Sequence, residues 1–217
     1  MSARRLPGPL LALTPGEPAS ASAPEILRRA GRAIEAGLDS ILLREPAFSD
    51  RETLDLARGL RALLGPRGWL GIHDRVHLAE AAGADGVHVG FRSLAAREAR
   101  AIAAPTIAVG FSAHAHDAPE ARAGADYLLF GPLFATPSKA GLLAPVGLET
   151  LARAVQASPV PLWAVGGITP DNAAALSACG AAGVAVRAAV LGARDGKPAT
   201  RALLAVLPRG GPRPAIG

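Results

Sequence analysis

The sequence predicts an α/β fold, a single (β/α)₈ TIM barrel, on three observations. The chain has 217 residues, close to the usual size of one such barrel. Half of its residues are hydrophobic, which is enough for a sizeable core. Short apolar runs alternate along the chain with amphipathic, alanine- and arginine-rich stretches, as expected when buried parallel strands alternate with helices.

Eight apolar runs are expected to be strands, and each is followed by a stretch of helical length. The strands are expected at 10–13, 40–43, 69–72, 86–89, 106–110, 127–130, 161–165 and 183–186. The helices are expected at 23–36, 50–64, 75–82, 94–103, 118–123, 148–157, 170–178 and 200–207. We therefore expect one domain at 1–207, and a disordered glycine- and proline-rich tail at 208–217.

A short motif recurs where four of the expected helices meet the strands that follow them. It reads Ala-Gly-Leu-Asp at 36–39, Ala-Gly-Ala-Asp at 82–85 and at 123–126, and Cys-Gly-Ala-Ala at 179–182. Its glycine suits a helix end that needs a positive φ. Four copies of one helix-to-strand joint favour a closed barrel, with a doubly wound open sheet as the alternative.

The basic charge is not arranged as a nucleic-acid interface would be. The formal net charge is +5, and lysine occurs only at Lys139 and Lys197, so nearly all basic residues are arginines. The arginines are scattered, and no basic run is interleaved with aromatic residues, which argues against nucleic-acid binding. The charge still favours anionic ligands through the local field.

No segment predicts export or membrane insertion. The run at 10–13 is too short for the apolar part of a signal peptide, and no run reaches the roughly 18–20 apolar residues that span a bilayer. We therefore expect a cytoplasmic protein with no membrane partner. The sequence leaves the oligomeric state open, and a homo-oligomer is compatible with it.

In barrels of this class the chemistry lies at the carboxyl ends of the strands. That rule selects polar and glycine positions after seven of the expected strands. They are Arg44, His73, Asp74, the segment 91–93, Ser112, His114, the loop 131–145, Gly166, Gly167 and Arg187.

The loop after the sixth expected strand is the strongest candidate for binding a phosphate. Thr136, Ser138 and Lys139 put two hydroxyls and an ammonium within four positions, and all three can donate to phosphate oxygens. The glycine pair at 166–167 precedes an expected helix start, where backbone N–H groups and the helix dipole favour an anion. Residues 183–187 repeat this arrangement, so we expect a small phosphorylated substrate.

Asp74 and Arg44 each allow two interpretations. The Asp74 carboxylate can bind Mg²⁺ together with phosphate oxygens, or it can cap a helix that starts at Arg75. Arg44 is either a ligand for an anion or an ion-pair partner of Glu45 or Asp74, and the ligand role is favoured.

The five histidines differ in their expected positions. His73 and His114 lie at the expected active rim, where they can bind substrate or transfer protons. His88 lies inside an expected strand and is interpreted as a packed core residue. His77 and His116 are expected on the surface.

Four motifs, met in this order, resemble the thiamine phosphate synthase / TenI superfamily over most of the chain. They read Leu-Arg-Glu at 43–45, His-Asp-Arg-Val at 73–76 with Gly-Ala-Asp-Gly-Val-His-Val-Gly at 83–90, Gly-Pro-Leu-Phe-Ala-Thr-Pro-Ser-Lys at 131–139, and Ala-Val-Gly-Gly-Ile at 164–168. The resemblance implies a (β/α)₈ barrel that binds the thiazole phosphate of thiamine biosynthesis.

The resemblance also implies a reaction and residue roles. A synthase joins the thiazole phosphate to hydroxymethylpyrimidine diphosphate, with Mg²⁺ helping the diphosphate to leave. By position, the phosphate would be held by the hydroxyls of the sixth loop and by backbone of the seventh and eighth, at Thr136, Ser138, Gly166, Gly167, Val186 and Arg187. Arg44, Lys139 and Asp74 with its Mg²⁺ would hold the diphosphate, and Ser112 would contact the pyrimidine.

The sequence departs from the synthase pattern in three loops. Pro46 stands where a synthase usually has a lysine, His73 where it has an asparagine, and Phe91-Arg92-Ser93 where it has Gln-Glu-Asp. The last change removes a second Mg²⁺ ligand. Arg92 can compensate for the missing lysine.

Three functions follow from these similarities and departures. The favoured one is a transferase, a thiamine phosphate synthase with a divergent diphosphate site. A TenI-like thiazole tautomerase is the second, but Pro132 replaces the histidine that such an isomerase uses, so His114 or His73 would have to act instead. A non-catalytic binder of thiazole phosphate is the third.

Overall fold

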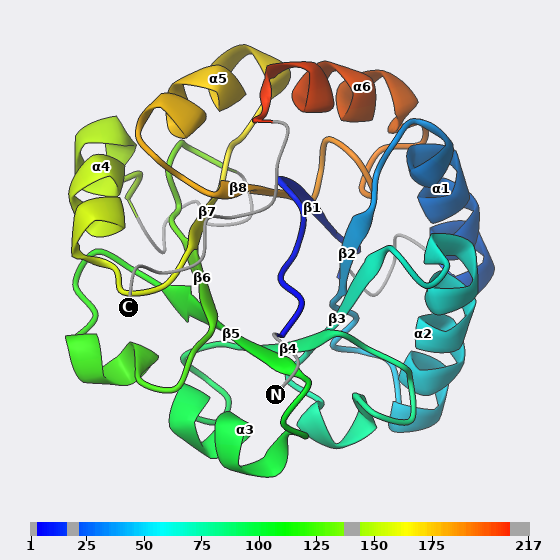
Figure 1. Ribbon diagram of the computed structural model, residues 1–217. Helices are drawn as coiled ribbons and strands as arrows, with labels where there is room; N and C mark the ends of the chain where they lie inside the picture. The colour runs from blue at the N-terminus through cyan, green and yellow to red at the C-terminus, as the bar shows by residue number, and fades with distance from the viewer. Residues whose placement is uncertain (1–3, 17–21, 137–143, 209–217) are drawn as a thin grey trace.

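Eight parallel strands close into a barrel in chain order, and helices surround it (Figure 1). The computed structural model describes residues 4–16, 22–136 and 144–208. The strands are β1 Leu10–Leu13, β2 Ser40–Leu43, β3 Trp69–His73, β4 Gly86–Val89, β5 Ala108–Ala113, β6 Tyr127–Phe130, β7 Leu162–Val165 and β8 Gly183–Val186. The (β/α)₈ prediction is confirmed, and the pairing of Leu10 with Val184 in β8 excludes an open sheet.

Six α-helices and two short 3₁₀ helices connect the strands in the described ranges. The α-helices are α1 Ala23–Glu35, α2 Asp50–Leu64, α3 Ala96–Ile102, α4 Gly147–Ala157, α5 Pro170–Ala178 and α6 Lys197–Val206. The 3₁₀ helices are η1 Val76–Leu78 and η2 Pro119–Arg122. None of the helices in these ranges is long and apolar enough to cross a membrane. The tail expected at 208–217 lies outside the described residues from 209 onward.

Two helices expected from the sequence are wrong, and two strands extend past their expected ends, β3 by one residue to His73 and β5 by three. The helix expected at 75–82 is only η1, because Asp74 and Arg75 leave the helical region and Gly83 turns the chain with φ 62°. The helix expected at 118–123 is only η2, which Gly124, with φ 89°, follows closely. The fifth strand runs to Ala113 rather than to residue 110, so Ser112 lies inside it.

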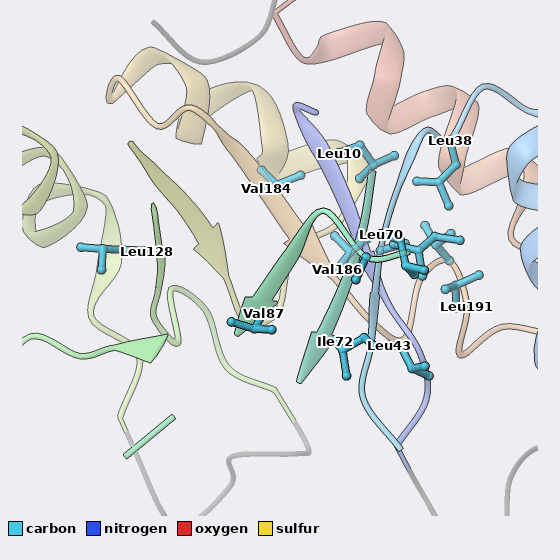
Figure 2. Packing of buried hydrophobic residues seen from close by; sticks show 14 of the residues in the cluster. Leu10, Leu38, Leu43, Leu70, Ile72, Val87, Leu128, Val184, Val186 and Leu191 are labelled. Atoms are coloured by element: carbon cyan, nitrogen blue, oxygen red, sulfur yellow. The ribbon is translucent and has the colours of Figure 1, made fainter. Parts of the chain in front are cut away.

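The outer face of the barrel packs against the helices through aliphatic side chains. Alternate strand residues point outward, and Figure 2 shows several of them, including Leu10, Leu70, Ile72, Val87 and Val184. The apolar faces of the helices cover these residues and are fully buried there. This layer follows from burial of apolar surface, which contributes roughly 25 cal/mol for each Å² removed from water.

Aromatic rings fill the inside of the barrel. The Trp69 ring lies 5.9 Å from the Tyr127 ring, and the Tyr127 ring lies 5.7 Å from the Trp163 ring, both in edge-to-face geometry. Glycines on neighbouring strands make room for them. A Cβ at Gly71 would lie 2.4 Å from the Trp69 ring, and a Cβ at Gly110 would lie 2.1 Å from the Tyr127 ring. The rings therefore pack only because these positions carry no side chain.

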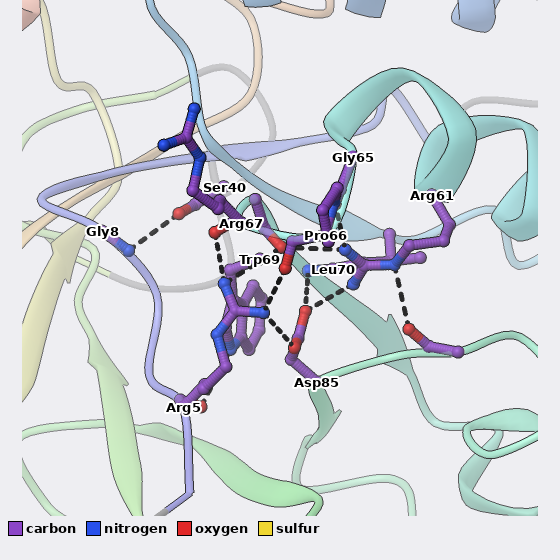
Figure 3. Close-up of polar contacts among 12 residues, drawn as sticks. Arg5, Gly8, Ser40, Arg61, Gly65, Pro66, Arg67, Trp69, Leu70 and Asp85 are labelled. Atoms are coloured by element: carbon purple, nitrogen blue, oxygen red, sulfur yellow. Dashed lines mark hydrogen bonds and ion pairs between the residues drawn. The ribbon is translucent and has the colours of Figure 1, made fainter.

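Residues 4–9 lie across the amino-terminal end of the barrel. The indole N–H of Trp69 donates to the Arg5 carbonyl at 3.0 Å, and that of Trp163 donates to the Gly8 carbonyl at 2.9 Å. Figure 3 shows how Arg5 and Arg61 both pair with Asp85, which also accepts from the backbone N–H of Leu70. These contacts close one end of the barrel, so the opposite end is left for a binding site.

Replacing Gly110 with alanine is expected to destabilise the barrel by about 1–3 kcal/mol, since the new methyl group would overlap the Tyr127 ring. The control is Gly31→Ala in α1, where a Cβ has no heavy atom within 4 Å. That change should stabilise by roughly 0.5–1 kcal/mol, because glycine inside a helix costs conformational entropy. Denaturant unfolding of both variants measures the difference, and equal effects would contradict this account of the interior.

Replacing Asp85 with alanine is expected to cost about 2 kcal/mol, because it leaves the partly buried Arg61 and the Leu70 N–H without their shared carboxylate. The control is Asp55→Ala, which breaks an exposed pair with Arg51 and should change stability by less than about 0.5 kcal/mol. Both free energies of unfolding can be taken from urea titrations. A loss at Asp85 no larger than at Asp55 would show that this cluster does not stabilise the closed end.

Candidate active site

A cavity of about 770 Å³ opens at the carboxyl ends of the strands. Residues at or just after the ends of all eight strands line it, from Leu13 after β1 to Arg187 after β8. This is the end of a (β/α)₈ barrel at which active sites lie. Residues 4–9 close the amino-terminal end of the barrel and aromatic rings fill its interior, so the cavity opens at the carboxyl ends of the strands.

The cavity brings together every site residue expected from the sequence that the structure describes. These residues are Arg44, His73, Asp74, Ser112, His114, Thr136, Gly166, Gly167, Val186 and Arg187. Ser138 and Lys139 lie outside the described residues, between positions 136 and 144.

Strand alternation explains how side chains distant in sequence meet here. Every second residue of a strand points to the inside of the barrel. Leu42, Gly71 and Gly110 take such inward positions. Two residues further along each strand, Arg44, His73 and Ser112 therefore reach the cavity. The same spacing brings their backbones to one rim, because neighbouring strands are in parallel register there.

Cationic side chains outnumber carboxylates among the described residues that line the cavity. Arg44, Arg92 and Arg187 face it, against the single carboxylate of Asp74. Arg44 forms no ion pair with Glu45 or Asp74 in the described part of the chain, so the ion-pair interpretation is wrong. Glu45 is buried and accepts instead from the backbone N–H of Gly16 at 3.1 Å. A cavity with this balance attracts anionic ligands.

Asp74 adopts a left-handed backbone conformation, with φ 62°. Its N–H donates to the His88 carbonyl on β4, and its carboxylate lies 2.9 Å from Nδ1 of His73. It is not a helix cap, because Arg75 is the residue before η1 and no side chain caps that helix. Left-handed residues other than glycine often mark functional positions, and here the turn directs the carboxylate toward the cavity.

The Asp74 carboxylate stays ionised at neutral pH. Burial raises the pKa of this carboxyl, but hydrogen bonds with His73 and Ser93 outweigh burial and hold the pKa below its ordinary value. Ser93 occupies the rim after β4 and its hydroxyl also bonds the Gly90 backbone. The described residues contain no cluster of three or more His, Cys, Asp or Glu side chains that could hold a metal by themselves.

His88 was missed as a site residue by the sequence analysis. It is buried, as expected of a core histidine, yet it also lines the cavity, and its Nε2 lies 2.9 Å from the Ser112 hydroxyl. Burial, followed by the nearby His73, lowers the pKa of His88 well below its ordinary value, so the ring is uncharged. Alternation along β4 could have found it, since Gly86 and His88 both take inward positions.

The rim after β4 and β5 carries an aromatic and a histidine. Phe91 is 67% exposed, its ring lies 6.1 Å from the His114 ring, and the Arg92 guanidinium sits 5.4 Å above it. The His114 backbone N–H donates to the Asp117 carboxylate at 2.7 Å, which fixes the start of this loop.

The loops after β6 and β7 pack tightly on each other. Gly166 and Gly167 have φ of 100° and 66°, and a Cβ on either would lie 2.7 Å or less from backbone or side-chain atoms of residues 132–135. Only glycine suits this combination of backbone angle and close approach. The carboxamide of Asn172 in α5 donates to the Gly167 carbonyl at 3.0 Å, which ties the glycine pair to the helix that follows.

Comparisons with known proteins agree with this geometry. The family described as thiamine monophosphate synthase matches residues 11–190. A thiamine-phosphate synthase of Moorella thermoacetica is 43% identical over 183 residues, covering 82% of this chain and 86% of the relative. One of Chlorobium luteolum is 40% identical over 179 residues, covering 81% and 84%.

A solved structure extends the likeness to three dimensions. The thiamine phosphate pyrophosphorylase from Pyrococcus furiosus superposes with a TM-score of 0.78 at 32% identity, over 91% of this chain and 94% of that one. Motifs, cavity and relatives thus point the same way, and the chain belongs to the thiamine monophosphate synthase family.

Proposed function

We propose that the protein is a transferase that makes thiamine phosphate from thiazole phosphate and hydroxymethylpyrimidine diphosphate. The observation that supports this most is the convergence of Arg44, Asp74, Ser112, Thr136 and Gly167 on one cavity. These residues come from five different strand ends, and Arg44, Asp74, Thr136 and Gly167 stand in the four motifs that resemble the family. An excess of cations around them suits two phosphorylated substrates.

The diphosphate end of the site is assigned to Arg44, Lys139 and Asp74. In the reaction the bond from the pyrimidine methylene to the diphosphate oxygen breaks, and the thiazole nitrogen forms the new bond to that carbon. Negative charge grows on the leaving diphosphate, so fixed cations that meet it there lower the barrier. Arg44 offers a planar guanidinium for two parallel hydrogen bonds, and Lys139 adds an ammonium with three donors.

Mg²⁺ fits this end of the site as a partner of the diphosphate rather than as a resident of a protein cage. Mg²⁺ is usually bound by one or two carboxylates while water and substrate phosphates complete its shell. Asp74 supplies one ionised carboxylate at the cavity, with the Ser93 hydroxyl beside it. When bound, the ion would neutralise charge on the leaving diphosphate.

The phosphate of the thiazole is assigned to the other side of the cavity. Thr136 and Ser138 would donate hydroxyl hydrogen bonds, and the backbone of Gly166, Gly167 and the 186–187 turn would donate N–H groups. Close packing of the loops after β6 and β7 supports a preformed site there.

A second candidate function is isomerisation of a thiazole phosphate, favoured by His73 and His114, two of the three histidines that line the cavity. Nδ1 of His73 lies 2.9 Å from Asp74, and Nδ1 of His114 lies 3.4 Å from Asp117. A carboxylate at Nδ1 leaves Nε2 for proton transfer. Pro132, which lines the cavity at the position of the tautomerase histidine, has no group that moves a proton.

Incubation of the protein with both substrates and Mg²⁺ is expected to yield thiamine phosphate and diphosphate, measured by chromatography. EDTA should abolish the product and excess Mg²⁺ should restore it, because the diphosphate site offers a single described carboxylate. Isomerised thiazole phosphate formed without metal would instead support the second candidate. Binding of thiazole phosphate without turnover of any kind would contradict both and leave a binding protein.

Replacing either proposed cation of the diphosphate site, Arg44→Ala or Lys139→Ala, is expected to lower kcat/KM by about 100- to 1000-fold, as for the loss of other preorganised charge stabilisers. The matched controls are Arg51→Ala and Lys197→Ala, which remove exposed cations on the outer helices and should change kcat/KM by less than about twofold. Full activity of either cation variant would remove that residue from the site.

A further inference from the structure

His88 connects the packed interior of the barrel with the cavity. Its side chain is 1% exposed, yet it forms part of the cavity wall. On the cavity side, its Nε2 and the Ser112 hydroxyl are 2.9 Å apart. On the interior side, its ring lies 5.6 Å from the Tyr127 ring. The proposed reaction does not use this buried imidazole.

Two buried polar atoms lie on the interior side without a hydrogen-bond partner among the described residues. One is Nδ1 of His88 and the other is the hydroxyl of Tyr127. Both border the space over Gly110, where a Cβ would lie 2.5 Å from Nδ1 and 2.1 Å from Cζ of Tyr127. Buried polar atoms without a partner are rare in folded proteins because leaving one unpaired is costly. That cost constrains where the protons of the His88 ring and the Tyr127 hydroxyl lie.

The constraint fixes which nitrogen of His88 carries the proton. Burial raises the pKa of the Tyr127 phenol, so its O–H remains intact and can only gain by facing an acceptor. An uncharged imidazole has one N–H and one bare nitrogen. An N–H on Nδ1 would be a buried donor with no acceptor among the described residues, which costs more than an unpaired lone pair, so the bare nitrogen is Nδ1 and the proton is on Nε2, 2.9 Å from the Ser112 oxygen.

The proton on Nε2 determines what Ser112 can do. The Nε2–H donates to the Ser112 oxygen, which leaves the serine hydrogen for another acceptor. Ser112 lines the cavity, so that hydrogen is available to a bound molecule.

We propose that His88 is a positioning residue that holds Ser112 as a hydrogen-bond donor toward the cavity. Ser112 therefore selects a substrate that presents an acceptor atom at this point, such as an aromatic ring nitrogen without hydrogen. The inference rests on the proposed function for its substrate, the pyrimidine diphosphate, but its account of His88 does not depend on turnover.

The functional test compares three replacements of His88 with Ser112→Ala. His88→Gln keeps an amide donor near the Nε2 position, His88→Asn places its amide near Nδ1 and out of reach of Ser112, and His88→Leu removes the polar group. We expect Ser112→Ala, His88→Leu and His88→Asn each to lower kcat/KM for the pyrimidine diphosphate by about tenfold or more, with His88→Gln recovering most of the loss.

The double variant His88→Leu/Ser112→Ala should lose no more than about twofold beyond Ser112→Ala, because both changes remove one interaction. The Kd of thiazole phosphate, measured by calorimetry, should stay within about threefold in all variants, since its phosphate is bound by other loops. Additive losses, or a His88→Gln variant as impaired as His88→Asn, would overturn the proposal. Because Gln and Asn are a matched polar pair, they decide the question even if the leucine variant does not fold.

The second test reads the proton directly and needs no activity. Long-range ¹H–¹⁵N NMR of the histidine rings distinguishes the two uncharged tautomers, and loss of one set of signals in His88→Gln assigns those of His88 among the five histidines. We expect the Nε2–H form for His88. An Nδ1–H form would overturn the proposal, whereas absence of transferase activity with the Nε2–H form would count against the proposed function alone.

Discussion

The fit between three aromatic rings and the glycines opposite them is the constraint on which the rest of this barrel depends. Trp69, Tyr127 and Trp163 occupy the interior in edge-to-face contact, and each needs a neighbouring strand position without a side chain. Interiors packed to this density tolerate neither a gap nor an added methyl group easily. The rings also form a floor beneath the cavity, so strand ends above them can carry polar side chains without opening the core to water.

The arrangement of polar groups follows from this floor. The side chains of Arg44, His73, His88 and Ser112 stand on inward strand positions at or above the level of the rings. Backbone or side-chain contacts hold each of these residues in place, which keeps the site in one geometry before substrate binds. The cost of this preorganisation is visible at Asp74, whose left-handed backbone is imposed by its bond to the β4 carbonyl of His88.

The sequence was most informative where one physical signal dominates. Parallel strands buried on both faces must be apolar runs, so all eight were found, and motif residues at their carboxyl ends converge on one cavity. Prediction failed where the backbone between strands decides the structure. A left-handed Asp74 and the turn at Gly83 reduced one expected helix to a single turn, which composition alone does not reveal. His88 is buried, as its position inside a strand predicts, and it also lines the cavity. Its inward spacing from Gly86 indicates both properties.

Closure of the sheet has a consequence for synthesis of the chain. Residues of β1 leave the ribosome long before Val184 and its neighbours in β8, with which they pair. Until that last strand emerges, the nascent protein holds an incomplete sheet with two unpaired apolar edges, the kind of surface that associates with other chains. The first strand must therefore remain without its final neighbour while β2 to β8 are synthesised, and this interval is when chaperones have most to protect.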